Sequence, residues 1–387
     1  MIPLSVPNLI GKELQYLKKC VDTEFVSSVG SFVTRFEKKI SNYTKSKYAV
    51  ACNSGTSSLH LALRVINCEK DNEVIVPTVT FAATINPIIY ERARPIFMDC
   101  DEYFNLDISK TLNFLRKNTF KKGKYTFNKK TKNKIIAIIP VHVFGNACDL
   151  TELIKICRKK NIKVIEDAAE ALGTFYKKNK KHAGTLGDIG CLSFNGNKII
   201  TSGGGGMLLT NDRNLAIRAR HLSTQAIKEP TNYIHDDIGY NYRLTNLQAA
   251  VGCAQLEKIK FFLKKKKDIY QNYKNLFKNF FQVNFANVPE YSNNNKWMMS
   301  VILKNKNKNK NKKNLINFLK KNKIQSRSIW KPNHIQKPFL KYEKFQIKKA
   351  NTVFKNTINI PCSTNLSIKD AKKVVKIIRK FYSNINK

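Results

Sequence analysis

Short apolar segments alternate with helical patterns through the first half of this 387-residue chain. Apolar runs typical of buried strands occupy residues 48–52, 73–76, 95–98, 135–141 and 164–165, and helical patterns occupy 59–66, 81–90 and 150–160. Strands that alternate with helices predict a doubly wound α/β domain with a mostly parallel sheet. Because ligands bind beyond the carboxyl ends of such strands, the polar residues that follow them are the first candidates for a site.

A second, smaller α/β domain is predicted toward the C-terminus. The helical pattern that begins after Thr245 continues to about Leu276 and leads out of the first domain. It is followed by an apolar strand at 298–303 and by helices at 314–322 and 368–382. We therefore expect a large domain over residues 1–260 and a small C-terminal α/β domain over residues 261–387.

The formal net charge of +43 raises the question of a nucleic-acid or anionic partner. The lysines are spread over the whole chain and mixed with asparagine, and no helix-turn-helix, zinc-finger spacing or RNP-like strand accompanies them. We therefore expect an anionic small substrate and no nucleic acid. Two basic stretches, 111–134 and the Lys/Asn repeat at 304–313, are interpreted as insertions, the first a surface excursion and the second a mobile hairpin loop.

Cysteine usage and the N-terminus indicate a cytoplasmic protein without a membrane partner. The nine cysteines are odd in number and include no CxxC pair, which argues against a disulfide framework and a zinc site. No apolar run approaches the roughly 18 residues of a membrane span, and the first residues lack the features of a signal peptide. Neither His142 nor His334 has a partner at metal-ligand spacing, so no metal is expected.

One lysine, Lys198, stands in an unusual setting within residues 187–206. A short apolar strand and a polar turn precede it, and two isoleucines, a Thr-Ser pair and four glycines follow. Apolar surroundings favour the neutral amine, which can attack a carbonyl, and the hydroxyl of Ser193 on the preceding strand can bind a phosphate. These features indicate a Schiff-base lysine for pyridoxal 5′-phosphate. An ordinary loop lysine in a lysine-rich chain is the competing interpretation.

Segments elsewhere in the chain supply candidate partners for that cofactor. Gly55, Thr56 and Ser57 lie between a strand end and a helix start, where free N–H groups and hydroxyls bind anions or simply cap the helix. Asp167 ends a buried strand and suits a protonated pyridine nitrogen, although it or Glu166 would also serve as a helix cap.

Other polar and aromatic residues near strand or helix ends remain open to two interpretations. Glu170 follows Asp167 closely enough to lie near the phenolic oxygen of the cofactor. Phe81 at another strand end is a stacking partner for the ring or a core residue. Asn241 and Arg243, just before a long helix, are donors for phosphate or carboxylate, or polar loop residues.

Taken together, these segments resemble the fold type I pyridoxal-phosphate aminotransferases that act on nucleotide-linked keto sugars, the DegT/DnrJ/StrS type. The matching stretches run in one order from residue 2 to about residue 363 and include NSGTSSLHLAL, VPTVTFAATINPI, VIEDAAEALG, GDIGCLSFNGNK, TSGGGGMLLTND and GYNYRLTNLQAAVGCAQLEKI. The strongest likeness is to the branch that makes UDP-4-amino-4,6-dideoxy-N-acetyl-hexosamines in the bacillosamine and legionaminic acid pathways.

The resemblance implies a role for each candidate. Lys198 would form the Schiff base and Asp167 would pair with the pyridinium nitrogen, with Glu170 by the phenolic oxygen and Phe81 stacked on the ring. The phosphate would be held by Gly55, Thr56, Ser57 and Ser193, and by Asn241 from a partner subunit. A homodimer with its sites at the subunit interface is therefore expected. Arg243, Trp330 and His334 are candidates for contacts with the diphosphate or sugar.

The resemblance also implies a reaction. L-glutamate would donate an amino group to the 4-keto carbon of UDP-4-keto-6-deoxy-N-acetylglucosamine, for surface-glycan or nonulosonic acid biosynthesis. The alternative within the same chemistry is a GDP-perosamine synthase. The alternative from another class is a non-catalytic regulator with this fold, or a basic nucleic-acid-binding protein.

Overall fold

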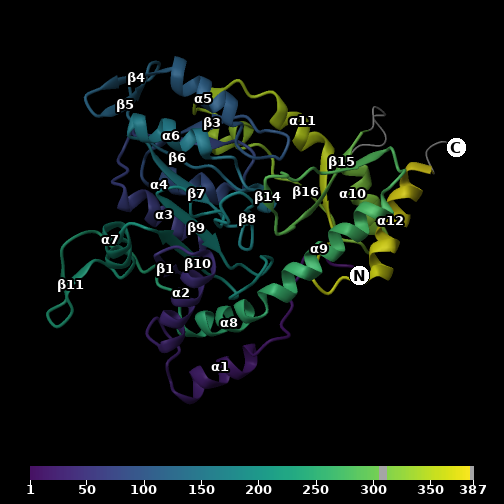
Figure 1. Cartoon of the computed structure of the whole chain (residues 1–387), viewed down its shortest axis with the longest axis horizontal. Helices are drawn as coiled ribbons and strands as arrows, with labels where there is room; N and C mark the ends of the chain where they lie inside the picture. Colours follow the sequence, from purple (N-terminus) through teal and green to yellow (C-terminus); the bar gives the residue numbers. More distant parts are fainter. Residues whose placement is uncertain (305–311, 384–387) are drawn as a thin grey trace.

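The computed structural model describes residues 1–304 and 312–383, and its largest feature is an eight-stranded sheet (Figure 1). The strand order is β1-β10-β9-β7-β6-β2-β3-β17. The strands are β1 (Tyr48–Cys52), β2 (Glu73–Pro77), β3 (Arg94–Met98), β6 (Ile135–Ile138), β7 (Lys163–Asp167), β9 (Ile189–Ser193), β10 (Gly206–Thr210) and β17 (Lys344–Phe345). Only the pairings of β10 with β1 and β9 are antiparallel within this sheet, which confirms the mostly parallel α/β fold.

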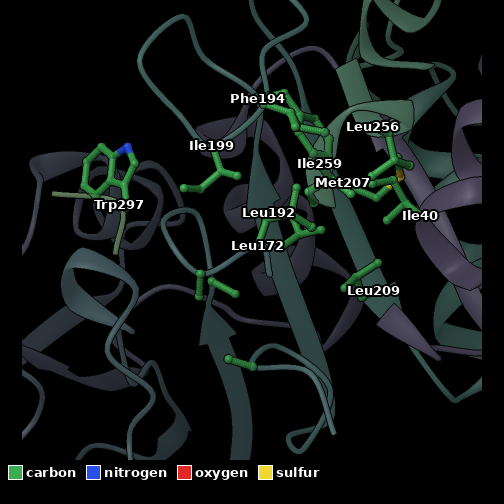
Figure 2. Close-up of a cluster of buried hydrophobic side chains, with 14 of the residues drawn as sticks. Ile40, Leu172, Leu192, Phe194, Ile199, Met207, Leu209, Leu256, Ile259 and Trp297 are labelled. Atoms are coloured by element: carbon green, nitrogen blue, oxygen red, sulfur yellow. The ribbon is translucent and has the colours of Figure 1, made fainter. Parts of the chain in front are cut away.

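Helices cover both faces of this sheet because its strands are apolar on both faces. Along β10, Met207 and Leu209 join the buried cluster that contains Phe36 of α2 (Ser31–Thr44) and the buried face of α8 (Asn246–Glu257), and Figure 2 shows part of this cluster. The intervening Leu208 packs in a second cluster with α3 (Gly55–Val65) and α7 (Arg213–Ser223). Successive side chains of a strand point to opposite faces of the sheet. The side chains of β10 alternate between the two clusters, so the sheet is buried on both faces.

Two predictions for the first half of the chain need correction. The helix expected over 81–90 is a short 3-10 turn, η1 (Ala82–Thr84), followed by α4 (Asn86–Tyr90), because Pro87 in the first turn cannot donate a backbone hydrogen bond. The stretch 111–134 is not wholly a surface excursion. Its first residues belong to α5 (Ile108–Lys117), which buries Phe114 and Leu115 against the sheet.

The rest of that stretch is a hairpin. It consists of β4 (Thr119–Lys122) and β5 (Tyr125–Asn128), and lysines at its turn are exposed. The prediction failed over α5 because its apolar residues at helical spacing stand among basic ones. The other basic stretch, predicted as a loop at 304–313, falls mainly on residues 305–311, which lie outside the described residues; Lys312 already belongs to α10 (Lys312–Lys321).

A second, smaller sheet has four antiparallel strands in the order β13-β15-β18-β16. Its strands are β13 (Val283–Phe285), β15 (Met299–Leu303), β18 (Thr357–Ile360) and β16 (Arg327–Ser328), and α10 and α12 (Ile368–Ser383) pack with it. The long helix expected after Thr245 is two helices, α8 and α9 (Ile259–Leu276), which meet at Lys258 and run from the large sheet toward the small one (Figure 1).

Segments from both ends of the chain cross between the two sheets. β17 adds an edge strand to the large sheet by pairing with β3, although it lies after residue 260 in the chain. Ile2 in turn donates its backbone N–H to Lys323 of the later half. The division at residue 260 therefore stays a prediction.

The remaining elements are short or peripheral. They are α1 (Glu13–Asp22), α6 (Thr151–Lys160), α11 (Lys349–Asn356), β8 (Phe175–Tyr176), β11 (Ile227–Glu229), β12 (Ile234–His235), β14 (Ser292–Asn293), η2 (Val143–Gly145), η4 (Asn333–Ile335) and η5 (Lys337–Phe339). Across residues 1–304 and 312–383, no helix has the length and apolar character to cross a bilayer, and no three His, Cys, Asp or Glu side chains gather as a metal site. All nine cysteines are buried and unpaired.

Candidate active site

Lys198 lies in a turn at the edge of the sheet where β9 ends. Its backbone N–H donates to the Asn195 carbonyl, and only 13% of its side chain is exposed. The amine nitrogen Nζ lies 3.6 Å from Glu170 Oε1 and 4.1 Å from the centroid of the Trp297 ring. The amine is therefore held between a carboxylate and an aromatic face, not displayed to solvent as a loop lysine would be.

Gly206 begins β10, and because it has no side chain the strand lies closer to the start of α3 than any other residue at this position would allow. A Cβ on Gly206 would lie 2.2 Å from the Ser54 carbonyl oxygen, well inside van der Waals contact. In the sheet register, Gly206 pairs with both Cys52 and Ser193. This row brings Ser193 beside the residues that follow β1, so a Cβ on Gly55 would lie 2.8 Å from Ser193 Cβ.

The start of α3 is shaped by its own side chains. Ser54 is the N-cap, since its Oγ accepts the Ser57 N–H at 3.0 Å, and the Ser57 hydroxyl donates to Asn53 Oδ1 at 2.6 Å. The first turn of a helix carries N–H groups without intrahelical acceptors and the positive end of the helix dipole. The structure thus brings Gly55, Thr56 and Ser193 together at a helix start whose free N–H groups suit an anion, while Ser57 is engaged in the cap.

The segment before α8 lies beside the same helix start. Asn53 donates its backbone N–H to the Tyr242 carbonyl at 2.8 Å and its side-chain amide to the Asn241 carbonyl at 3.1 Å. The exposed Asn241 side chain and the half-buried Arg243 therefore lie near the strand edge that carries Lys198. Among the described residues no carboxylate pairs with the Arg243 guanidinium, which leaves it available to an anion.

Asp167 ends β7 at this edge, and its register partner is Cys191 of β9. Its carboxylate is buried and accepts the Thr84 hydroxyl at 2.7 Å and the Ala169 N–H at 3.1 Å. Burial raises the pKa of Asp167, and these two bonds oppose the rise. No lysine, arginine or histidine of the described chain forms an ion pair with it. A buried carboxylate without a cation partner fits the protonated ring nitrogen of pyridoxal phosphate.

Glu170 is the acid nearest the lysine amine. One of its oxygens accepts the Phe144 N–H at 2.7 Å, and the other faces Lys198. Burial raises the pKa of Glu170 to about 7, and the nearby Lys198 charge is the largest opposing influence. Glu170 can therefore exchange a proton near neutral pH beside the amine.

Glu166, the acid before Asp167, has a structural role instead. No helix follows β7, so neither acid is the helix cap that the sequence left open. Glu166 is fully buried and accepts hydrogen bonds from His142 Nε2 and from three backbone N–H groups in the loop before β9. His142 Nδ1 accepts the Cys148 N–H, so the ring hydrogen lies on Nε2 and points to Glu166.

The remaining candidates lie around this core of the site. Phe81 is 60% exposed at the start of η1, so its ring is free to stack on a ligand. Trp330 stacks on Phe144 at 5.0 Å between centroids, next to the N–H that binds Glu170. His334 is buried, with Nδ1 2.7 Å from the Thr78 hydroxyl at the end of β2, and burial lowers its pKa.

Three contacts were not found from the sequence: Thr84 on Asp167, the Phe144 N–H on Glu170, and the Trp297 ring under Lys198. Thr84 and Phe144 belong to stretches already of interest, but nothing in their spacing indicates these bonds. Trp297 reaches the site from the start of the small sheet, far along the chain. Only the three-dimensional structure can supply such a pairing.

Known proteins resemble the chain along nearly its whole length. The model of the DegT/DnrJ/EryC1/StrS aminotransferase family matches residues 7–379. GDP-perosamine synthase of Escherichia coli O157:H7 is 36% identical over 385 residues, which cover 99% of each chain. The UDP-4-amino-4,6-dideoxy-N-acetyl-beta-L-altrosamine transaminase of Campylobacter jejuni is 28% identical over 378 residues, 96% of this chain and 95% of the relative. The structure of Helicobacter pylori PseC, an aminotransferase involved in the biosynthesis of pseudoaminic acid, has a TM-score of 0.88 at 22% identity over 99% of each chain.

Proposed function

The chain belongs to the DegT/DnrJ/EryC1/StrS aminotransferase family, and from this premise we propose that it aminates the 4-keto carbon of a nucleotide-linked 4-keto-6-deoxy sugar. It is a pyridoxal-phosphate-dependent sugar aminotransferase, as the resemblance implied. A GDP-linked sugar is our first candidate substrate, because the relative named GDP-perosamine synthase is 36% identical and the UDP-sugar transaminase 28%. The UDP sugar expected from the sequence becomes the second candidate.

The observation that carries this proposal is the setting of the Lys198 amine between Glu170 and Trp297, at the sheet edge where Asp167 also lies. Bound pyridoxal phosphate supplies an electron sink for the charge left when a proton leaves the carbon beside the amino group. The buried Asp167 carboxylate keeps the ring nitrogen protonated. Lys198 Nζ moves the proton, and Glu170 holds or releases one beside it.

Two further parts of the proposal concern partners. We expect L-glutamate as the amino donor and a homodimer in which Asn241 reaches the phosphate of the partner's site. The homodimer is supported by exposed apolar side chains in two segments, one at the N-terminus and one after α7: Leu9, Ile10, Leu14, Val21, Phe25, Val29, Tyr233 and Ile238. Exposed apolar side chains are the kind of surface that protein interfaces cover. The cytoplasmic location stays a prediction.

The non-catalytic alternative has lost its support. A regulator or nucleic-acid binder has no use for a lysine amine enclosed by a carboxylate and an aromatic ring, and the chain belongs to an aminotransferase family. The charge of +43 remains consistent with an anionic nucleotide sugar as substrate.

The test loads the enzyme with L-glutamate, removes the excess and offers two substrates in turn. These are GDP-4-keto-6-deoxy-mannose and UDP-4-keto-6-deoxy-N-acetylglucosamine, and the original cofactor absorption is followed. Its return with the GDP sugar alone supports the first candidate, and its return with the UDP sugar alone replaces it by the second. Return with neither rejects both candidate substrates.

Lys198→Ala tests the chemistry itself. We expect this variant to lose turnover entirely, because the amine is the proton-moving group. It should keep its circular dichroism spectrum, because Lys198 lies in a turn outside the helices and strands. Lys18→Ala is the matched control, since that lysine is exposed on α1 and pairs only with Asp22. Turnover by the Lys198 variant at the rate of the control would contradict the mechanism.

A further inference from the structure

Trp297 touches the Lys198 loop at two points. Its indole Nε1 donates a hydrogen bond to the carbonyl of Asn197 at 2.7 Å, and its ring lies 4.1 Å below the Lys198 amine. The side chain is buried and belongs to the same hydrophobic cluster as Ile199, the residue after Lys198 (Figure 2). The ring therefore fixes both the backbone before the lysine and the nitrogen at the end of its side chain.

Trp297 is itself held by polar bonds that also reach Glu170. Its backbone N–H donates to Asn295 Oδ1 at 2.9 Å, and its carbonyl accepts the buried Lys266 amine at 2.9 Å. The amide nitrogen of Asn295 donates to the Glu170 carbonyl at 2.7 Å. Asn295 thus joins the backbones of Trp297 and Glu170, whose side chains lie around the Lys198 amine.

In every catalytic cycle a transaminating lysine releases the cofactor and later binds it again. While free and protonated, the amine is a cation in a mostly buried place, which is costly unless partners stabilise it. An aromatic face attracts an ammonium by roughly 0.5–2 kcal/mol without accepting its proton. Glu170 is the only carboxylate of the described residues within 4 Å of the amine.

We propose that Trp297 and Glu170 form the resting place of the free Lys198 ammonium, with Trp297 as a residue that positions the amine for its return. This inference rests on the proposed function, because only a lysine that alternates between bound and free states needs such a place. If Trp297 only filled the core, its replacement by another apolar side chain would affect stability and leave the amine unchanged.

Two substitutions distinguish the effect of the aromatic ring from the effect of an apolar side chain that only fills the space. Trp297→Phe keeps an aromatic face and loses the bond to Asn197, whereas Trp297→Leu keeps an apolar side chain and loses the ring. Phe261→Leu is the matched control, because that ring lies 5.6 Å from the Lys265 amine on α9, outside the site.

The first readout uses the cofactor-free chain and needs no substrate. An amine-acylating reagent is added, and mass spectrometry measures how fast Lys198 is labelled relative to the exposed Lys18. Loss of the ring frees the amine, so Trp297→Leu should raise the relative rate roughly 2- to 10-fold, and Trp297→Phe should raise it less. The Phe261→Leu control should match wild type. Equal Lys198 labelling in wild type, Trp297→Leu and Trp297→Phe would overturn the proposal.

The second readout is steady-state turnover of the loaded enzyme with whichever keto sugar is accepted. Trp297→Leu should lower kcat at least roughly threefold with KM unchanged, and Trp297→Phe should restore most of it. An increase of KM alone would overturn the positioning role. If Trp297→Leu fails to fold, Glu170→Gln replaces it in the labelling experiment: loss of the carboxylate should raise the Lys198 rate, and an unchanged rate would overturn the proposal. If neither sugar is aminated, the proposed substrate fails while the labelling result still decides the role of Trp297.

Discussion

Replacing the buried Glu166 by glutamine should destabilise the chain strongly, although the two side chains have almost the same shape. One carboxylate oxygen accepts the N–H groups of Leu186 and Gly187, each at 2.6 Å. The other accepts His142 Nε2 and the Gly184 N–H, each at 2.8 Å. All four partners are donors, so the site requires two acceptor oxygens.

A glutamine amide offers one oxygen and one NH2 group. Whichever way the amide turns, two donors lose their acceptor and face another donor in a site with no exposure to water. Each unsatisfied buried donor costs about 1–3 kcal/mol, so the free energy of unfolding should fall by about 2–6 kcal/mol. The loop between β8 and β9 and the His142 turn should loosen with it.

Urea unfolding followed by circular dichroism at neutral pH measures this loss. The midpoint should fall with an unchanged slope, because the surface exposed on unfolding is the same. Glu152→Gln on α6 is the matched control, since its carboxylate is exposed and pairs only with Lys155, and it should change the stability by less than about 0.5 kcal/mol. A Glu166→Gln variant as stable as that control would refute the requirement for two acceptors.

The pH dependence gives the same prediction a second test. Burial raises the pKa of Glu166, but the bonds from His142 and the backbone N–H groups outweigh it and hold the pKa below its usual value. The unfolded chain therefore binds this proton more tightly, so the stabilisation is present above the unfolded pKa of about 4.3 and is lost as the pH falls through the folded value. The stability gap between wild type and Glu166→Gln should narrow in acid.

Two further predictions concern the edge of the sheet that carries the site. Gly206→Ala should cost more than about 2 kcal/mol in urea unfolding, because the methyl group would lie 2.2 Å from the Ser54 carbonyl. Gly196→Ala, where a Cβ meets open space, should cost less than about 0.5 kcal/mol, and equal losses would contradict the close approach. Glu170→Gln should make the stability of the cofactor-free chain less dependent on pH between about 4.5 and 7, because burial raises the pKa of Glu170 to about 7 and the stability that this group contributes in acid is lost as the pH rises through that value. The same pH dependence in both forms would argue against a buried, easily protonated Glu170.

The strand edges of the large sheet could be predicted because apolar runs end there in polar residues. β1 and β2 lie within one residue of their predicted bounds, and β7 extends the predicted 164–165 by a few residues. In a mostly parallel sheet the carboxyl ends of the strands meet at one edge, so Ser193, Asp167 and the start of α3 are expected there. Their proximity therefore follows from the sequence pattern.

The contacts that tune the site could not be predicted because they join distant segments through single side chains. Trp297 and Asn295 come from the chain that enters the small sheet, and nothing in NNNKWMMS distinguishes them from loop residues. The burial that raises the pKa of Glu170 and the four donors around Glu166 are equally properties of the packed molecule. Helix α5 was missed for a different reason, since its apolar residues are hidden in a basic stretch.

The reversed direction of β10 explains why the lysine stands where it does. A chain that leaves β9 and enters an antiparallel neighbour must turn back at the same edge, so residues 194–205 stay beside the ends of β1, β7 and β9. A parallel successor would have required a crossover connection of a dozen or more residues, and the chain would not have turned back within this edge. The turn is short enough to hold the amine near Asp167 and Glu170, yet one wall of its site comes from Trp297, just before β15 of the small sheet. The position of the amine therefore depends on how β15 and its neighbours pack against the large sheet, and substitutions at that contact should alter turnover without touching the cofactor's own ligands.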